Sequence, residues 1–225
     1  MLEALLSGDI RTFMMSLLFR LPIVLLALCL HETAHSFVAY KLGDPTAKAL
    51  GRLTLNPLKH LDPIGFGCMV LFGFGWAKPV PIDTRYFKEP KKGMALTAAA
   101  GPVSNILLAF VFAILLRIMV GVLTSLNISS VSELGYWVIY SLQTFLLLGI
   151  RLNLSLAVFN LIPIPPFDGS RIFLSMLPEK TYFAVMRYER YIYVAFLFVL
   201  AMGWLDVPIS FLTDKLMDLL FLITF

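Results

Sequence analysis

The sequence predicts an all-α polytopic membrane protein with about four to six membrane segments and a short re-entrant β-hairpin or loop. The chain of 225 residues is 59% hydrophobic and only 14% charged, whereas soluble domains carry about 25% charged residues. Several apolar runs reach the length of about 20 residues that a helix needs to cross a bilayer. A single membrane-embedded domain, residues 1–225, accounts for this length, and the lipid bilayer is its first predicted partner.

The formal net charge of +4 indicates how the chain is oriented in the membrane and requires no nucleic acid as a partner. Lys and Arg gather in the loops 46–63 and 78–92 and in the connection 171–190, whereas the loop 123–134 contains neither. Cytoplasmic loops of membrane proteins are enriched in Lys and Arg. The three basic stretches are therefore predicted to lie together on the cytoplasmic side.

The first apolar run, 21–40, is predicted to be a membrane helix, which ends before Pro45 because proline cannot continue it. In the basic loop that follows, residues 53–55 alternate as in a short strand. His60 in this loop is expected to be solvated, with a role as a metal ligand as the alternative. The next apolar run, 64–76, is too short to cross as a helix and contains four glycines. A re-entrant loop or hairpin fits it better, and such backbone must line protein or a wet cavity.

Two further runs, 94–122 and 135–162, are long enough to span the membrane. A shorter apolar run, 191–205, follows near the C-terminus. The tail after residue 206 carries its apolar and charged side chains on opposite sides, so it either spans or lies as an amphipathic helix at the interface.

The strongest chemical signal is His31-Glu32-Thr33-Ala34-His35, inside the first apolar run. Histidines four positions apart lie on one face of a helix, so both imidazoles can bind one metal ion. H-E-x-x-H is the pattern of zinc metalloproteases, in which the glutamate acts as the base. The chain has only three histidines, and ionisable groups inside a membrane segment are costly enough to indicate a function.

A third ligand is predicted at Asp168, eight residues after Asn160. The residues 163–166 include three prolines and cannot be helical, so Asp168 stands on a rigid, extended support. Catalytic zinc usually has three protein ligands and one open position. His31, His35 and Asp168 are therefore predicted to bind one Zn²⁺ per chain.

Glu32 is then free to accept a proton from a zinc-activated water that attacks a peptide carbonyl. The developing oxyanion needs a hydrogen-bond donor, for which Asn160 is the first candidate. The second is Asn105, the last residue of Gly101-Pro102-Val103-Ser104-Asn105. For Asn105, a hydrogen bond between helices is an equally good interpretation.

Three features in this order resemble the site-2 protease family of intramembrane zinc metalloproteases: the H-E-x-x-H motif, the segment 101–105, and Asn160 followed by Phe167-Asp168-Gly169. The family usually has Leu at the position of Phe167. The resemblance covers about residues 21–177, the expected catalytic core, and leaves 182–225 as C-terminal helices.

This resemblance implies zinc ligation by His31, His35 and Asp168, with Glu32 as the catalytic base and Asn160 as an active-site amide. It also implies a transmembrane protein substrate, bound as an extended strand and cut in or near its membrane segment, as in regulated intramembrane proteolysis. In that family a sheet or re-entrant strand lies beside the catalytic site, so the re-entrant loop or hairpin, within residues 46–76, is predicted to lie near the active site. The compact relatives it resembles, which lack an appended regulatory domain, suggest a bacterial plasma membrane.

Two functions of other classes compete with proteolysis. A membrane zinc transporter would also carry histidines and an aspartate on its helices, but transporters usually have two related halves, and no repeat is visible in this sequence. A catalytically silent membrane scaffold would keep the helices but would need neither Glu32 nor Asp168.

Overall fold

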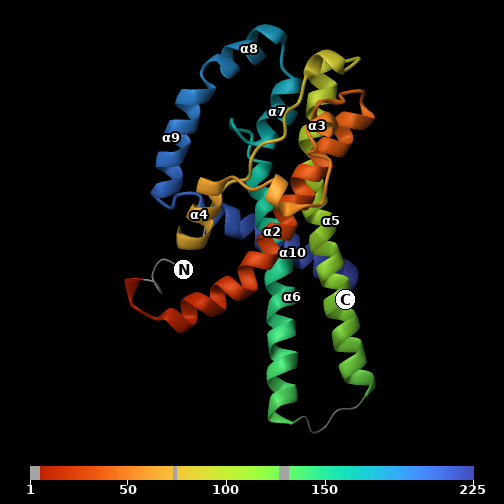
Figure 1. Cartoon of the computed structure of the whole chain (residues 1–225), viewed down its shortest axis with the longest axis vertical. Helices are drawn as coiled ribbons and strands as arrows, with labels where there is room; N and C mark the ends of the chain where they lie inside the picture. Colours follow the sequence, from red (N-terminus) through yellow and green to blue (C-terminus); the bar gives the residue numbers. More distant parts are fainter. Residues whose placement is uncertain (1–5, 73–74, 127–131) are drawn as a thin grey trace.

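The computed structural model describes residues 6–72, 75–126 and 132–225. Three of its helices are long and apolar enough to cross a membrane: α2 (Ile10–Lys41), α5 (Pro90–Ser125) and α6 (Glu133–Asn160). Helices α5 and α6 lie side by side as a long hairpin, and α2 crosses them obliquely near the middle of the molecule (Figure 1). The predicted all-α membrane class is confirmed, whereas the number of four to six membrane segments stays a prediction.

Shorter helices complete the fold within the described residues. They are α3 (Thr46–Ala49), α4 (Pro63–Phe72), α7 (Asp168–Ser175), α8 (Glu179–Arg187), α9 (Glu189–Ala201) and α10 (Asp206–Thr224), with single 3₁₀ turns η1 (Pro57–Lys59) and η2 (Thr84–Tyr86). Helices α3, α7 and α8 gather at one end of the molecule, opposite the end where α5 stops and α6 starts (Figure 1).

The main hydrophobic core lies where α5 faces α6. Small residues on α5, such as Ala109 and Ala113, are fully buried and let the two helices approach closely. The remaining core residues come from α2, α5, α6 and α10: Ile23, Phe112, Leu116, Leu146, Ile150, Leu154 and Leu220. This core holds the helices that carry the predicted site in a fixed relation to one another.

The C-terminal helix α10 packs against α6 and, to a lesser extent, α5. Arg151 and Asp214 form an ion pair of 3.2 Å between α6 and α10, and the hydroxyls of Ser155 and Thr213 lie 3.3 Å apart. Of the C-terminal helices after residue 182, α10 is therefore joined to the core by polar contacts. Whether α10 spans the membrane or lies at its interface stays open.

The apolar run 64–76 differs from the sequence-based expectation. Its first part forms α4, where a loop or hairpin was predicted, and the chain then returns to pair Leu61 with Ala77 in an isolated antiparallel bridge. A Cβ atom on Gly65 would lie 2.2 Å from the carbonyl oxygen of Trp76. This glycine therefore permits a close approach of the returning chain and does not break the helix. The predicted strand at 53–55 was wrong, because these residues form bends.

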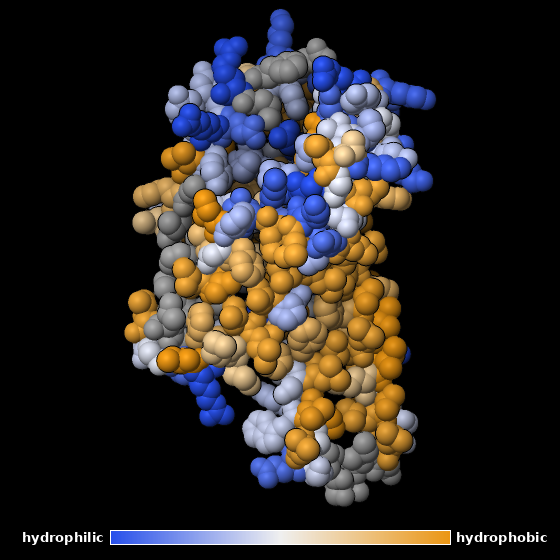
Figure 2. Space-filling model, viewed as in Figure 1, coloured by the Kyte–Doolittle hydropathy of each residue, from blue (hydrophilic) through white to orange (hydrophobic). Residues whose placement is uncertain are grey.

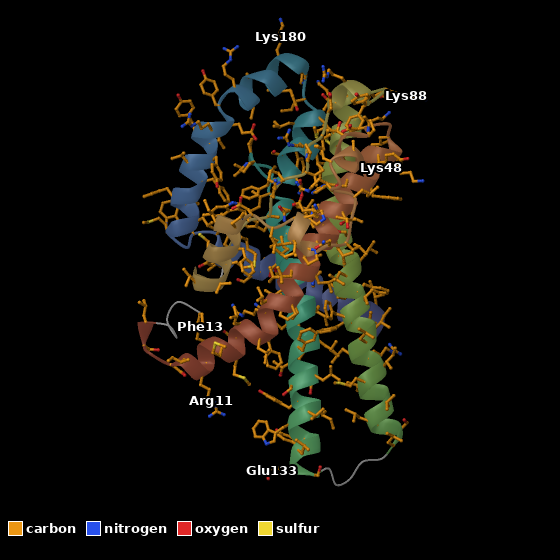
Figure 3. All side chains as sticks on the ribbon, viewed as in Figure 1. Arg11, Phe13, Lys48, Lys88, Glu133 and Lys180 are labelled. Carbon is orange, nitrogen blue, oxygen red and sulfur yellow. The ribbon has the colours of Figure 1, made fainter. Side chains whose placement is uncertain are left out.

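Polarity divides the surface along the long axis of the molecule. Hydrophilic residues gather at one end and a broad hydrophobic zone covers the middle (Figure 2). Lys48, Lys88 and Lys180 lie at the hydrophilic end, whereas Glu133 lies at the opposite tip of the α5–α6 hairpin (Figure 3). This distribution is that of a protein embedded in a bilayer with one positively charged end.

Candidate metal centre

The three predicted ligands meet at one point, although Asp168 is more than a hundred residues of chain away from the two histidines. His31 and His35 lie one turn apart on α2, and Asp168 is the first residue of α7. The Nε2 atoms of His31 and His35 lie 3.1 and 3.3 Å from Asp168 Oδ2. The ring centroids of the two histidines are 4.6 Å apart and their planes are nearly perpendicular.

This arrangement fits a zinc ion. Two ligand atoms held about 2.1 Å from zinc at a tetrahedral angle are about 3.4 Å from each other, which is close to the 3.1 and 3.3 Å between each imidazole nitrogen and the carboxylate oxygen. Asp168 Oδ2 is buried and has no hydrogen-bond partner in the described residues. A buried carboxylate oxygen that faces two imidazole nitrogens without a hydrogen bond needs a cation as its partner.

Helix α5 orients both imidazoles from behind. The carbonyl oxygen of Thr97 lies 2.7 Å from His35 Nδ1, so this nitrogen donates and Nε2 keeps its lone pair for a metal. The amide group of Asn105 lies 3.3 Å from His31 Nδ1. Each histidine is thus held at the nitrogen that points away from Asp168, as outer-shell partners hold the histidines of zinc sites.

Asn105 is almost fully buried and its Oδ1 atom has no partner in the described residues. A neutral imidazole that binds metal through Nε2 carries its proton on Nδ1. Rotation of the Asn105 amide would present the unpaired Oδ1 to that proton. The position of Asn105 behind His31 suits a residue that orients the ligand, and its role as an oxyanion donor stays a prediction.

Gly101 is the position where α5 passes over the two imidazoles. A Cβ atom there would lie 2.5 Å from His31 Cε1 and Nε2 and 2.5 Å from His35 Nε2. Real Cβ atoms essentially never approach so closely, so only glycine lets the helix pack against the ligands at this distance. The small-residue segment 101–105 therefore has two separate functions, since Gly101 makes room for the histidines and Asn105 contacts one of them.

Asp168 is positioned by the end of α6 and by an aromatic cluster. A Cβ atom on Gly169 would lie 2.2 Å from the carbonyl oxygen of Leu161, so the start of α7 packs directly on the last turn of α6. The ring of Phe167 lies 4.6 Å from the rings of Phe159 and Phe196, measured between centroids. The aromatic residue at 167 thus connects the ligand-bearing turn to helix α9.

A cavity of about 430 Å³ opens in front of the ligands. Glu32 lines it together with His31, His35 and Asp168, and its carboxylate makes no hydrogen bond or ion pair with the described residues. The opposite wall consists of the segment from Trp76 to Ile82, and further lining residues are Met94, Ala98, Asn160, Pro166, Phe167 and Arg171.

Asn160 is the last residue of α6 and its Nδ2 atom donates to the carbonyl of Leu156 at 2.9 Å. An amide nitrogen carries two hydrogens, so one donor remains for a group in the cavity. His60 lies outside the ligand cluster. It is 1% exposed and its Nε2 atom lies 2.8 Å from the carbonyl of Thr54, so the prediction that it is solvated was wrong.

Sequence reasoning missed two contributions to the site. The first is the carbonyl of Thr97, for which no side-chain pattern exists because a backbone oxygen makes the contact. The second is the part of the wall after residue 76. The run 64–76 was predicted to lie against the active site, and Trp76 does line the cavity, but residues 77–82 were not expected there. The prolines at 79 and 81 were a usable signal for it, since a segment that cannot form a helix beside an apolar run is a natural cavity lining.

Comparison with known proteins agrees with this geometry. Residues 19–203 match the family model described as Peptidase family M50. The chain is 42% identical over 182 residues to "Putative zinc metalloprotease YwhC" of Bacillus subtilis, and this match covers 80% of each chain.

Two relatives come from Methanocaldococcus jannaschii. "Putative zinc metalloprotease MJ0611" is 35% identical over 144 residues, which cover 63% of this chain and 62% of the relative. "Zinc metalloprotease MJ0392" is 32% identical over 158 residues, which cover 70% of this chain and 34% of the relative. No solved structure matches the chain at a comparable significance.

The family match spans the three predicted metal ligands and the glutamate beside them, and it favours the protease over the transporter and the silent scaffold. The chain belongs to Peptidase family M50, the site-2 protease family, and is a zinc metalloprotease with membrane-spanning helices.

Proposed function

We propose that this zinc metalloprotease cleaves peptide bonds in or near the transmembrane segments of other membrane proteins, the reaction used in regulated intramembrane proteolysis. The observation that carries the proposal is the position of the site. His31, His35 and Glu32 belong to a helix long and apolar enough to cross a membrane, and all three line one cavity. A peptide bond must reach the depth of this helix in the membrane to be cut. The transmembrane segment of another membrane protein already lies at that depth.

The residues of the cavity account for hydrolysis. Zinc held by His31, His35 and Asp168 would supply a Lewis acid that polarises the scissile carbonyl and acidifies water. Glu32 accepts a proton from the attacking water, whose oxygen bonds to the carbonyl carbon. The free N–H of Asn160 donates to the carbonyl oxygen as negative charge develops there. Glu32 then transfers its proton to the departing amine as the C–N bond breaks.

The wall segment 76–82 supports an extended substrate. Val80 lines the cavity, and neither its N–H nor its C=O makes a hydrogen bond within the described residues. An extended peptide pairs with such an edge through main-chain hydrogen bonds. Pro79 and Pro81 lack N–H groups, so within residues 79–81 only Val80 offers both a donor and an acceptor.

The charge distribution supports a site near the cytoplasmic side. Lys48, Lys88 and Lys180 lie at the hydrophilic end of the molecule (Figure 3), and α7, which begins with Asp168, lies toward the same end (Figure 1). Positively charged loops face the cytoplasm. The similarity to a Bacillus subtilis protein supports a bacterial plasma membrane as the setting.

Cleavage of a single-span membrane protein by the purified, zinc-loaded enzyme tests this function. Glu32→Gln is expected to retain zinc and to lower kcat by about 100-fold or more, because it removes the base without removing a ligand. Glu89→Gln is the matched control, since Glu89 is exposed and, among the described residues, its side chain pairs only with Lys92. Cleavage by Glu32→Gln at the wild-type rate would disprove the mechanism.

The extended binding mode is tested by replacing Val80. Val80→Pro removes the N–H but not the carbonyl, and Val80→Ala shortens the side chain while keeping both. We expect Val80→Pro to raise KM about fivefold, the value of one net hydrogen bond, and Val80→Ala to leave KM nearly unchanged. Equal effects of both variants would argue for a side-chain contact instead of backbone pairing.

A further inference from the structure

The wall segment 76–82 has little secondary structure of its own. Its pairing with the rest of the chain includes the bridge between Leu61 and Ala77 and a hydrogen bond of 2.7 Å from the N–H of Lys78 to the carbonyl of His60. A segment with so few backbone hydrogen bonds is easily displaced. Side chains from elsewhere must therefore fix its path.

Arg52 supplies such a contact at the start of the wall. Its guanidinium donates to the carbonyl of Pro79 at 3.2 Å and to the carbonyl of Lys78 at 2.5 Å. Arg52 is only 6% exposed, and the described residues give it no ion pair. A buried cation without a carboxylate partner is costly, and the two carbonyls that the guanidinium contacts are what offset this cost.

The two contacts also determine the direction of the wall. In a regular strand successive residues alternate between the two sides, so adjacent carbonyls point in opposite directions. Here the adjacent carbonyls of Lys78 and Pro79 both face Arg52. The chain thus departs from a regular strand at this point, and the next residue, Val80, lines the cavity.

Arg52 is connected to the catalytic helix at its other end. The hydroxyl of Ser36 lies 3.3 Å from the carbonyl of Arg52 and 3.0 Å from the carbonyl of Glu32, one turn earlier on α2. Ser36 is fully buried. A short chain of contacts therefore runs from the helical turn that carries Glu32, through Arg52, to the wall on the opposite side of the cavity.

The far end of the wall has its own attachment. Asp44 is fully buried, and its carboxylate accepts the N–H of Asp83 at 2.8 Å as well as the N–H of Thr46 at 2.9 Å. Asp44 therefore holds the C-terminal end of the wall independently of Arg52, which holds its N-terminal end. Replacement of Arg52 is thus expected to release the start of the wall, up to Val80, without releasing the whole segment.

We propose that Arg52 is a positioning residue for the protease reaction, and this inference rests on the proposed function. Arg52 lines neither the cavity nor the metal site. It fixes the distance between the wall that receives the substrate backbone and the turn of α2 that carries Glu32. Its loss therefore weakens substrate binding and leaves zinc ligation intact.

The test compares Arg52→Gln and Arg52→Lys with Lys59→Gln, which removes an exposed cation from the same loop. Zinc content, KM and kcat are measured on a single-span substrate. Arg52→Gln is expected to keep one zinc per chain and to raise KM roughly tenfold, with kcat within about twofold of wild type. Arg52→Lys falls between wild type and Arg52→Gln, because one ammonium group lacks the fork that contacts two carbonyls. Lys59→Gln behaves as wild type.

Amide hydrogen exchange gives a second measurement that needs no activity. In Arg52→Gln, exchange is expected to accelerate in peptides covering 76–82 and to stay unchanged in α5. If wild-type enzyme cuts no membrane substrate, the proposed function fails, while this exchange result still decides whether Arg52 holds the wall. An unchanged KM, or unchanged exchange, in Arg52→Gln overturns the inference. Absence of both Arg52 variants from the membrane, with Lys59→Gln present, would assign Arg52 to folding and overturn it as well.

Discussion

Replacement of Gly101 by alanine is the most direct perturbation of the metal site that leaves every ligand in place. The added methyl group would lie 2.5 Å from atoms of both imidazoles, where ordinary contacts begin at 3.4 Å. The helix and the histidines must therefore separate by about 1 Å. Zinc sites tolerate deviations of only about 0.2 Å in ligand distance, so this displacement is several times larger than the site accepts.

We expect Gly101→Ala to lower zinc affinity by about 100-fold, at the upper end of the effect of replacing an outer-shell partner. The assay is zinc content after dialysis against a graded metal buffer, with peptide cleavage measured in parallel. Gly121→Ala is the matched control, because it lies on the same helix and a Cβ atom there has no neighbour within 4 Å. Wild-type zinc affinity in Gly101→Ala would refute the close approach of α5 to the ligands.

Further substitutions test the ligands and their supports. Asp168→Ala should lose zinc, whereas Asp214→Ala, which removes a half-exposed carboxylate on α10, should keep it; zinc retention in Asp168→Ala would remove the third ligand. Asn105→Leu should lower zinc affinity 10- to 100-fold, because His31 loses its Nδ1 partner, and an unchanged affinity would leave Asn105 as a packing residue. Removal of zinc by a chelator should lower the thermal unfolding temperature of wild type and leave that of Asp168→Ala unchanged, since only a bound metal stabilises the fold by mass action.

The local sequence pattern was sufficient to predict the features that depend only on helical periodicity. His31 and His35 share a face because they are four positions apart on one helix, and this holds wherever the helix packs. The predicted spans beginning at 94 and 135 were confirmed as parts of α5 and α6 for the same reason, since long apolar runs have few alternatives to a helix in a bilayer. Asp168 was predicted as the third ligand from ligand chemistry, and its distances of 3.1 and 3.3 Å to the two histidines agree with that prediction.

Packing between distant segments decided the features that sequence reasoning missed or placed wrongly. The glycines of the run 64–76 are typical helix breakers, yet Gly65 lies inside helix α4. Its role is steric, because a side chain at this position would collide with the returning chain at Trp76. His60 carries a polar ring in a basic loop, which is typical of an exposed residue, but it is buried against the carbonyl of Thr54. Neither contact leaves a trace in the local periodicity of the chain.

The sequence by itself determined that this protein is a helical membrane protein with two histidines, a glutamate and an aspartate suited to a zinc protease. Only the tertiary structure decided what surrounds them: the carbonyl of Thr97 behind His35, Gly101 above both rings, and the wall held by Arg52. The physical reason is the range of the interactions. Helix formation and ligand chemistry depend on neighbours within one turn, whereas the environment of the site depends on which helix faces meet, and close packing of the whole chain decides that.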